Sequence, residues 1–124
     1  MKEVMAFLRA NKVNGTKKAL ADAGFPSFTC RKVLGRGKKT LDSTLVKLAL
    51  STDEVPMNAQ GEALSEHIRL VPKRFFTLIV EDGQVDEAAR TILRVNQTGN
   101  PGDGRIFILD IPETHCVRTG SDTL

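Results

Sequence analysis

The chain has 124 residues, of which 40% are hydrophobic, and a formal net charge of +3. This length fits one domain with its own core. Tyr and Trp are absent and the cations are spread along the chain, so a surface that stacks nucleic-acid bases is disfavoured. No apolar run is long enough to span a membrane, and the N-terminus lacks a signal-peptide pattern. We therefore expect a cytoplasmic protein without membrane insertion.

The first part of the chain predicts a strand–helix–strand unit. Residues 1–9 are apolar enough for a buried strand, and apolar residues recur at steps of three and four over 13–23, as in an amphipathic helix. Asn11 is suited to cap the start of this helix, and Gly24 to end it in a left-handed conformation. A second strand is predicted over 28–34.

The same order of elements recurs downstream. A strand is predicted over 75–80, a helix with its apolar stripe over 85–93, and another strand over 105–111. Two such units in a small chain predict an α+β fold, the ferredoxin-like double βαβ sandwich.

Both faces of the predicted sheet are apolar. Residues 75–80 and 106–109 place hydrophobic side chains on both sides, whereas helices cover only one face of an open antiparallel sheet. This pattern favours oligomerisation. The alternative is that the long segment 38–71 folds over the second face. Three leucines of that segment, at positions 41, 45 and 48, fit one face of a helix.

Two glycine-rich loops contain cations. Residues 98–105 hold three glycines followed by Arg105, and residues 35–39 hold two glycines among Arg36, Lys38 and Lys39. Glycines let backbone N–H groups approach an anion, and the cations add charge. The pair of loops suggests a phosphate-bearing ligand, although each loop alone is also compatible with an ordinary tight turn.

The residues of both units resemble the PII family of nitrogen-signalling proteins. The resemblance is carried by residues 1–4, 25–38, 71–74, 96–107 and 117–120, which are distributed over nearly the whole length of the chain in the family's order and spacing. The sequence Val-Leu-Gly-Arg-Gly-Lys within 25–38 looks most like the branch encoded beside nitrogenase genes.

The resemblance implies a single domain over 1–124 that assembles as a homotrimer, or as a mixed trimer with a related PII subunit. It implies that ATP or ADP binds in the clefts between subunits, and that Mg²⁺ and 2-oxoglutarate accompany ATP. The family's T-loop corresponds to about 37–71. This loop, with Leu41, Leu45 and Leu48 as contact residues, would dock on a nitrogen-metabolism target such as dinitrogenase.

Roles at single positions are also implied by the resemblance. Phe7 and Ile79 match the adenine pocket, Lys73 matches a lysine that pairs with 2-oxoglutarate, and Arg118 matches an arginine that reaches the phosphates from a neighbouring subunit. The positions implied to bind nucleotide are Phe7, Thr29, Gly35, Gly37, Lys38, Ile79, Gly102, Asp103, Gly104, Arg105 and Arg118.

Three residues depart from the family pattern. Cys116 stands where many members have a second phosphate-binding arginine, and loss of such a contact costs about 1.5–3 kcal/mol. Lys39 replaces a glutamine of the Mg²⁺ shell, and because an ammonium has no acceptor it would contact 2-oxoglutarate directly instead. Thr77 replaces an acidic residue near the adenine.

The leading hypothesis is a non-enzymatic regulator, since no set of nucleophile, base and orienting group is evident. The alternative is a PII-like trimer with altered ligand specificity, for ADP, AMP or another anion, that regulates a transporter or a carbon-metabolism protein. A ferredoxin-like RNA binder or a small hydrolase fits least. His67 and His115 lack the spacing of metal ligands, so no metal held by the protein is expected.

Overall fold

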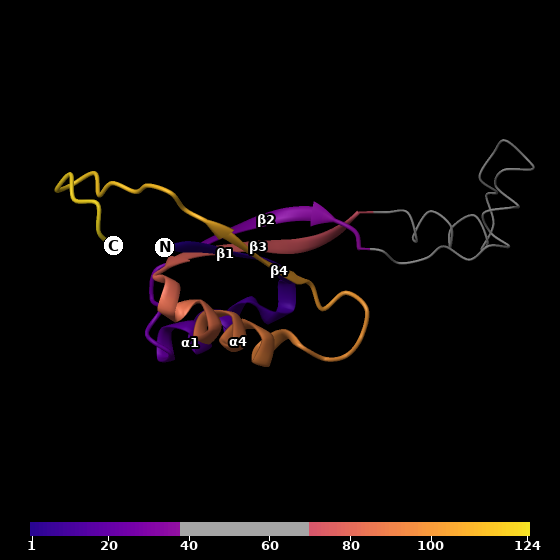
Figure 1. Cartoon of the computed structure of the whole chain (residues 1–124). Coiled ribbons are helices and arrows are strands. Elements are labelled where there is room, and N and C mark those ends of the chain that lie inside the picture. The colour runs from indigo at the N-terminus through magenta and orange to yellow at the C-terminus, as the bar shows by residue number, and fades with distance from the viewer. Residues whose placement is uncertain (38–69) are drawn as a thin grey trace, which may run out of the picture. The chain divides into compact units, whose positions relative to one another are not determined.

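The computed structural model describes residues 1–37 and 70–124. The chain divides into two units, one formed by Met1–Val33 and Pro72–Leu124 and the other by Leu34–Val71. The elements are β1 (Lys2–Arg9), η1 (Ala10–Lys12), α1 (Val13–Asp22), β2 (Thr29–Gly35), β3 (Val71–Val80), η2 (Asp82–Gln84), α4 (Val85–Asn96) and β4 (Arg105–Asp110). Figure 1 labels the four strands and the two α-helices, while η1 and η2 are short 3₁₀ turns.

The four strands form one sheet in the order β2-β3-β1-β4. Strand β1 pairs antiparallel with β3, from Lys2↔Val80 to Arg9↔Lys73, and antiparallel with β4, from Lys2↔Asp110 to Phe7↔Arg105. Each strand–helix–strand unit therefore places its helix on the sheet between two non-adjacent strands. This topology confirms the predicted ferredoxin-like α+β fold.

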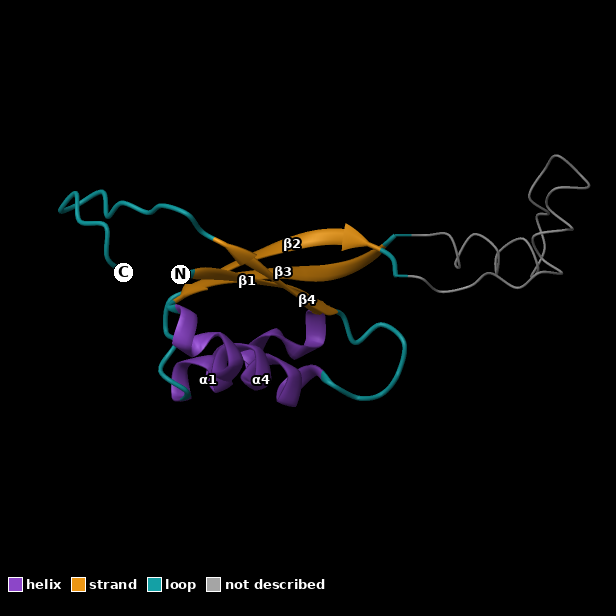
Figure 2. Cartoon of the chain, viewed as in Figure 1, coloured by secondary structure: helices purple, strands orange, loops and turns teal. Residues whose placement is uncertain are grey.

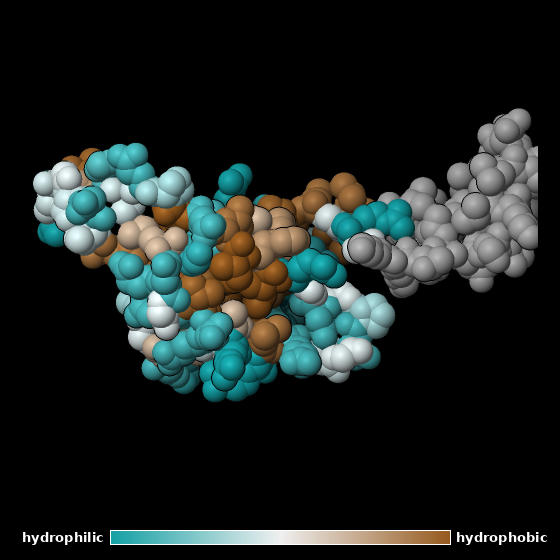
Figure 3. Space-filling view, in the orientation of Figure 1, coloured by the Kyte–Doolittle hydropathy of each residue, from teal (hydrophilic) through white to brown (hydrophobic). Residues whose placement is uncertain are grey.

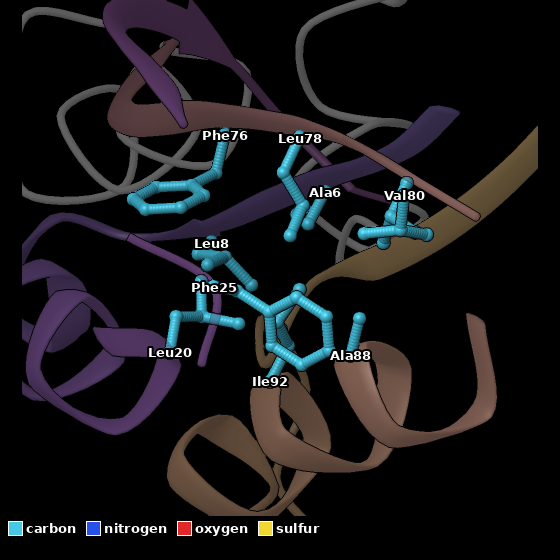
Figure 4. Close-up of a cluster of buried hydrophobic side chains, with 10 residues drawn as sticks. Ala6, Leu8, Leu20, Phe25, Phe76, Leu78, Val80, Ala88 and Ile92 are labelled. Atoms are coloured by element: carbon cyan, nitrogen blue, oxygen red, sulfur yellow. The ribbon is translucent and has the colours of Figure 1, made fainter. Parts of the chain in front are cut away.

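The two helices cover one face of the sheet, as Figure 2 shows. Alternate residues of β1 and β3 point toward the helices and are buried, in the period-two pattern of a half-covered sheet. Figure 4 shows part of this core. Its buried hydrophobic residues are Val4, Ala6, Leu8, Leu20, Phe25, Phe76, Leu78, Val80, Ala88 and Ile92.

Helix α1 begins differently from the prediction. Asn11 lies inside the 3₁₀ turn η1, and the N-cap is Lys12, whose side chain makes no capping hydrogen bond. The predicted Asn11 cap is wrong because the 3₁₀ turn continues directly into the helix and leaves no extended residue there. At the other end, Gly24 has φ of +92°, which confirms the left-handed terminus.

Helix α4 is longer than its apolar stripe indicates, because its last turn is held by polar contacts. The buried Asn96 Nδ2 donates to the Thr16 hydroxyl at 2.9 Å and to the Ile92 carbonyl at 2.8 Å. Thr16 in turn donates to the Lys12 carbonyl at 2.8 Å. A buried polar pair is stable only when hydrogen-bonded, so this bridge fixes how α1 packs on α4.

Strand β3 also begins before the predicted range of 75–80. Pro72, Lys73 and Arg74 carry little hydrophobic signal, yet Arg74 and Lys73 pair with Leu8 and Arg9 of β1. Pairing with β1 therefore extends β3 beyond its hydrophobic run, a constraint that local sequence does not show. The extension brings Lys73 to the end of the sheet where the 98–104 loop lies.

Candidate functional site

The loop over residues 98–104 joins α4 to β4 and is organised around the carboxylate of Asp103. The Thr98 and Gly99 N–H groups donate to Asp103 Oδ2 at 2.7 Å and 2.9 Å, and the Thr98 hydroxyl donates to Oδ1. Hydrogen bonds from the Thr98 hydroxyl, then from the Thr98 N–H, and after these from Arg9 and the Gly99 N–H, hold the pKa of Asp103 well below its usual value. An ionised carboxylate therefore gives the loop its shape.

Two cations of the sheet contact residues 101–103 of this loop. Arg9 and Lys73 are cross-strand neighbours at the end of β1 and β3. Arg9 forms an ion pair with Asp103 through Nη1 and donates from Nη2 to the Pro101 carbonyl at 2.9 Å. Lys73 Nζ donates to the Gly102 carbonyl at 3.1 Å. The loop is thus attached to both central strands.

Glycines are required at the point where the loop meets the sheet. Gly102 and Gly104 have φ of +96° and +111°, a region that other residues rarely adopt. A Cβ on Gly104 would overlap the carbonyl oxygen of Phe7 in β1. Close contact between backbone and backbone therefore explains Gly104 without any ligand.

The face of the sheet that the helices leave open is apolar. Phe7 lies at its centre, with ring centroids 5.2 Å from Phe75 and 6.3 Å from Phe107. Phe7, Ile79, Phe107 and Leu109 remain 37–42% exposed. Figure 3 shows apolar side chains gathered over the edge of the sheet where β4 lies. The prediction that both faces are apolar is confirmed.

The predicted adenine residues share this open face but lie apart. Phe7 pairs with Phe75, and Ile79 follows four residues further along β3, which is about 13 Å at strand spacing. Arg105 is the register partner of Phe7 on its other side. Within one chain, Phe7 and Arg105 lie together near the loop, whereas Ile79 does not.

Glu3 is a residue of the open face that the sequence did not single out. The Thr77 hydroxyl donates to Glu3 Oε1 at 2.8 Å. A carboxylate therefore stands beside the position where the family pattern has an acidic side chain. Only the strand register, which pairs Met5 with Thr77 and Glu3 with Ile79, reveals this neighbour.

Arg118 belongs to the segment that follows β4. This segment leaves the sheet at Asp110, which pairs with Lys2, while the 98–104 loop enters the sheet at Arg105, beside Phe7 (Figure 1). The two lie at opposite ends of a six-residue strand. The structure therefore does not bring Arg118 to the loop of its own chain.

Cys116 lies in a closed turn of this C-terminal segment. Its N–H donates to the Ser121 carbonyl and its carbonyl accepts from the Gly120 N–H, both at 2.7 Å. Hydrogen bonds from the Thr119 hydroxyl, then from the Thr119 and Arg118 backbone, lower the pKa of the Cys116 thiol. Cys30 and Cys116 are both free.

The second glycine-rich loop is described only in part. Thr29 begins β2 and Gly35 ends it, and Gly37 is the last described residue before the gap. The remaining predicted site residues of this region lie outside the described residues, namely Lys38, Lys39, Leu41, Leu45 and Leu48. His67 also lies outside the described residues. In the C-terminal segment, His115 Nε2 lies 2.7 Å from Glu113 Oε1.

Two further features bear on the class of site. Over 1–37 and 70–124, no cluster of side chains suited to a metal ion is present, and no helix there has the length and apolar character to cross a membrane. A shallow groove on the outer surface of α4 is lined by Asp86, Glu87, Arg90 and Arg94 with Gly83 and Thr91. Acidic and basic side chains line this groove together, and it has neither an apolar wall nor a glycine-rich backbone segment. The 98–104 loop is therefore the better candidate for anion binding.

A ferredoxin-like sheet with a glycine-rich, cation-flanked loop before its last strand defines the class of this protein. The model of the family "Nitrogen regulatory protein P-II" matches residues 1–121. A protein of Methanothermococcus thermolithotrophicus named "Nitrogen fixation nifHD region GlnB-like protein 2" is 39% identical over 97% of this chain and 93% of its own length. A similarly named protein of Methanosarcina barkeri ("nifHD1 region") is 37% identical over 97% and 94%.

A protein of Methanothermobacter thermautotrophicus named "Nitrogen regulatory protein P-II 2" is 32% identical over 97% of this chain and 91% of its own length. This chain belongs to the P-II family of nitrogen regulatory proteins. The resemblance inferred from the motifs is thereby confirmed.

Proposed function

We propose that this protein is a non-enzymatic, cytoplasmic signal protein that binds ATP or ADP, together with Mg²⁺ and 2-oxoglutarate, between its own subunits. The observation that carries the proposal is the loop before β4, where Gly102, Asp103 and Gly104 present backbone next to the cation Arg105 and the exposed ring of Phe7. Backbone amides and cations suit phosphates, and an exposed aromatic ring suits a base.

The geometry of one chain supports a site shared between copies. Phe7 and Ile79 lie about 13 Å apart along the strands, so one adenine does not contact both within a chain. The segment that contains Arg118 leaves the sheet at Asp110, at the end of β4 opposite the loop. A second copy placed on the apolar open face would supply Ile79 or Arg118 to the Phe7 and Gly102 of the first. A trimer, either of this chain alone or with a related PII subunit, meets this requirement.

We further propose that residues 37–71 form the surface that docks on the target, with Leu41, Leu45 and Leu48 as contacts. The relatives' names place them in nitrogen-fixation regions. A protein of nitrogen metabolism, dinitrogenase in particular, is the proposed partner. In a pull-down with purified dinitrogenase, replacement of the three leucines by serine should abolish an interaction that the parent protein shows.

Calorimetric titration with MgATP, alone and with saturating 2-oxoglutarate, tests the ligand proposal. Mutual enhancement of the two affinities is expected, since coupled sites must affect each other equally. Binding of ATP that ignores 2-oxoglutarate at every Mg²⁺ concentration would contradict the proposed sensor and support the alternative, a PII-like trimer that reads ADP, AMP or another anion and regulates a transporter or a carbon-metabolism protein.

Cys116 is the observation that favours this alternative, because a thiol stands where many family members carry a phosphate-binding arginine. The substitution Cys116→Arg distinguishes the two. If a triphosphate is the ligand, the added cation should raise ATP affinity about tenfold or more, as expected of one charge-assisted contact. Cys116→Ser, which adds no charge, is the matched control. An arginine that leaves ATP affinity unchanged would indicate a different anion.

A further inference from the structure

Two consecutive carbonyl groups of the 98–104 loop are held by cations of the sheet. The Pro101 carbonyl accepts from Arg9 Nη2 at 2.9 Å, and the Gly102 carbonyl accepts from Lys73 Nζ at 3.1 Å. Arg9 is further fixed by its ion pair with Asp103. Two adjacent peptide planes are therefore oriented by side chains from β1 and β3.

The orientation of a peptide plane also fixes its N–H group. In a planar trans peptide, the C=O and the following N–H point in opposite directions. Because the Pro101 and Gly102 carbonyls face Arg9 and Lys73, the N–H groups of Gly102 and Asp103 face away from these cations. Among the residues that the structure describes, none accepts a hydrogen bond from either N–H. Two successive outward N–H groups make an anion-binding nest.

We infer that Arg9, with Lys73, is a positioning residue that aims the Gly102 and Asp103 N–H groups at the phosphates of the ligand. This inference rests on the proposed function, since it concerns the same site. It also changes the role of Asp103. The carboxylate is occupied by Thr98, Gly99 and Arg9, so Asp103 contributes to the ligand through its backbone N–H rather than its side chain.

Lys73 acquires two partners under this inference. The resemblance gives it a carboxylate of 2-oxoglutarate, while the structure shows it donating to the Gly102 carbonyl. An ammonium has three N–H donors, so one side chain can contact both groups. Lys73 therefore connects the phosphate loop to the 2-oxoglutarate site, and its loss should weaken phosphate binding even when no 2-oxoglutarate is present.

The test compares Arg9→Gln, Arg9→Lys and Lys73→Gln with the parent protein and with Lys17→Gln, an exposed cation of α1 that serves as the matched control. ATP, AMP and inorganic triphosphate are titrated without 2-oxoglutarate. Arg9→Gln and Lys73→Gln should lower the affinity for ATP and triphosphate about tenfold and the affinity for AMP less. Arg9→Lys keeps the charge but reaches only one of the two acceptors, the Pro101 carbonyl and the Asp103 carboxylate. Its affinity for ATP should lie between those of the parent protein and Arg9→Gln.

A purely structural role for Arg9 predicts a different result. Arg9→Gln would then lower the thermal midpoint and reduce the affinities for ATP and AMP by the same factor, and that outcome overturns the inference. The inference is also overturned if Arg9→Gln and Lys17→Gln bind ATP with equal affinity. Failure of the proposed function is separable. If the parent protein binds inorganic triphosphate but no nucleotide, the nucleotide proposal fails while the Arg9 comparison is still decided by triphosphate. If the parent binds neither, both fail.

Discussion

The carbonyl oxygen of Phe7 occupies the space that a side chain on Gly104 would need. Strand β1 and the loop before β4 are therefore in direct backbone contact, at a residue with φ of +111°. We expect Gly104→Ala to lower the free energy of unfolding by about 1–3 kcal/mol, because it adds both strain and overlap. Chemical denaturation measures this change.

Gly83→Ala is the matched control for this substitution, since a Cβ there meets nothing within 4 Å and no positive φ is involved. It should raise the free energy of unfolding by about 0.4–1 kcal/mol, because alanine restricts the unfolded chain and meets no obstacle in the folded one. Equal losses in the two variants would show that the contact with Phe7 is not what requires glycine at position 104.

The ionised state of Asp103 makes the folded protein sensitive to acid. Because its pKa is lowered in the folded state from 3.8, its stabilising contribution is complete above about pH 4 and is lost as the pH falls below that value. Asp103→Asn should be less stable than the parent protein at pH 7, and the difference should shrink toward pH 2. Denaturation curves at several pH values measure it.

Asp22→Asn is the control for the acid effect, because Asp22 makes an exposed ion pair with Lys18 on α1. It should reduce stability little at any pH. If Asp103→Asn and the parent protein lose stability in parallel between pH 5 and pH 2, Asp103 does not contribute to the acid sensitivity.

The open face of the sheet is the surface through which we expect copies to associate. Phe107→Glu places a charge beside Phe7 on that face and should shift the protein from an oligomer to the monomer, as measured by sedimentation equilibrium. Leu93→Glu is the matched control, because Leu93 is 48% exposed on α4. If Leu93→Glu dissociates the protein and Phe107→Glu does not, copies associate through the helices instead.

The hydrogen bonds around Cys116 should make its thiol the more reactive of the two. Because the Thr119 hydroxyl and nearby backbone N–H groups favour the thiolate, alkylation by iodoacetamide should be faster at Cys116 than at Cys30, with a rate midpoint below the usual thiol pKa. Thr119→Val should raise that midpoint. Mass spectrometry of timed samples gives both rates, and an unchanged midpoint in Thr119→Val would contradict the assignment.

Local sequence patterns predicted the elements of the fold because each helix and strand buries one face. The apolar runs in β1 and β3 and the stripe in α4 are signals of this kind. The Asn11 cap was wrong because residue preference does not distinguish a cap from a 3₁₀ turn that runs into the helix. The start of β3 was missed because pairing with Arg9, rather than hydrophobicity, extends that strand to Lys73.

The candidate site was predicted in part for a similar reason. The glycines and Arg105 form a contiguous motif, so the loop was found from the sequence. Arg9 and Glu3 were missed because their roles depend on which residues lie opposite them in the sheet. Arg9 is recognisable from the strand register, because it forms the last pair of β1 with β3 and lies opposite another cation, Lys73.

Phe7 has a backbone that meets the loop and a ring that faces the open side of the sheet. A shift of Gly104 toward β1 would meet the carbonyl of Phe7, the residue whose ring we propose a neighbouring copy covers. Ligand binding at the loop and association of a second copy on the open face would therefore both act on Phe7. If the proposed trimer and nucleotide site are present, dilution of the protein and depletion of the nucleotide should both favour dissociation of the subunits.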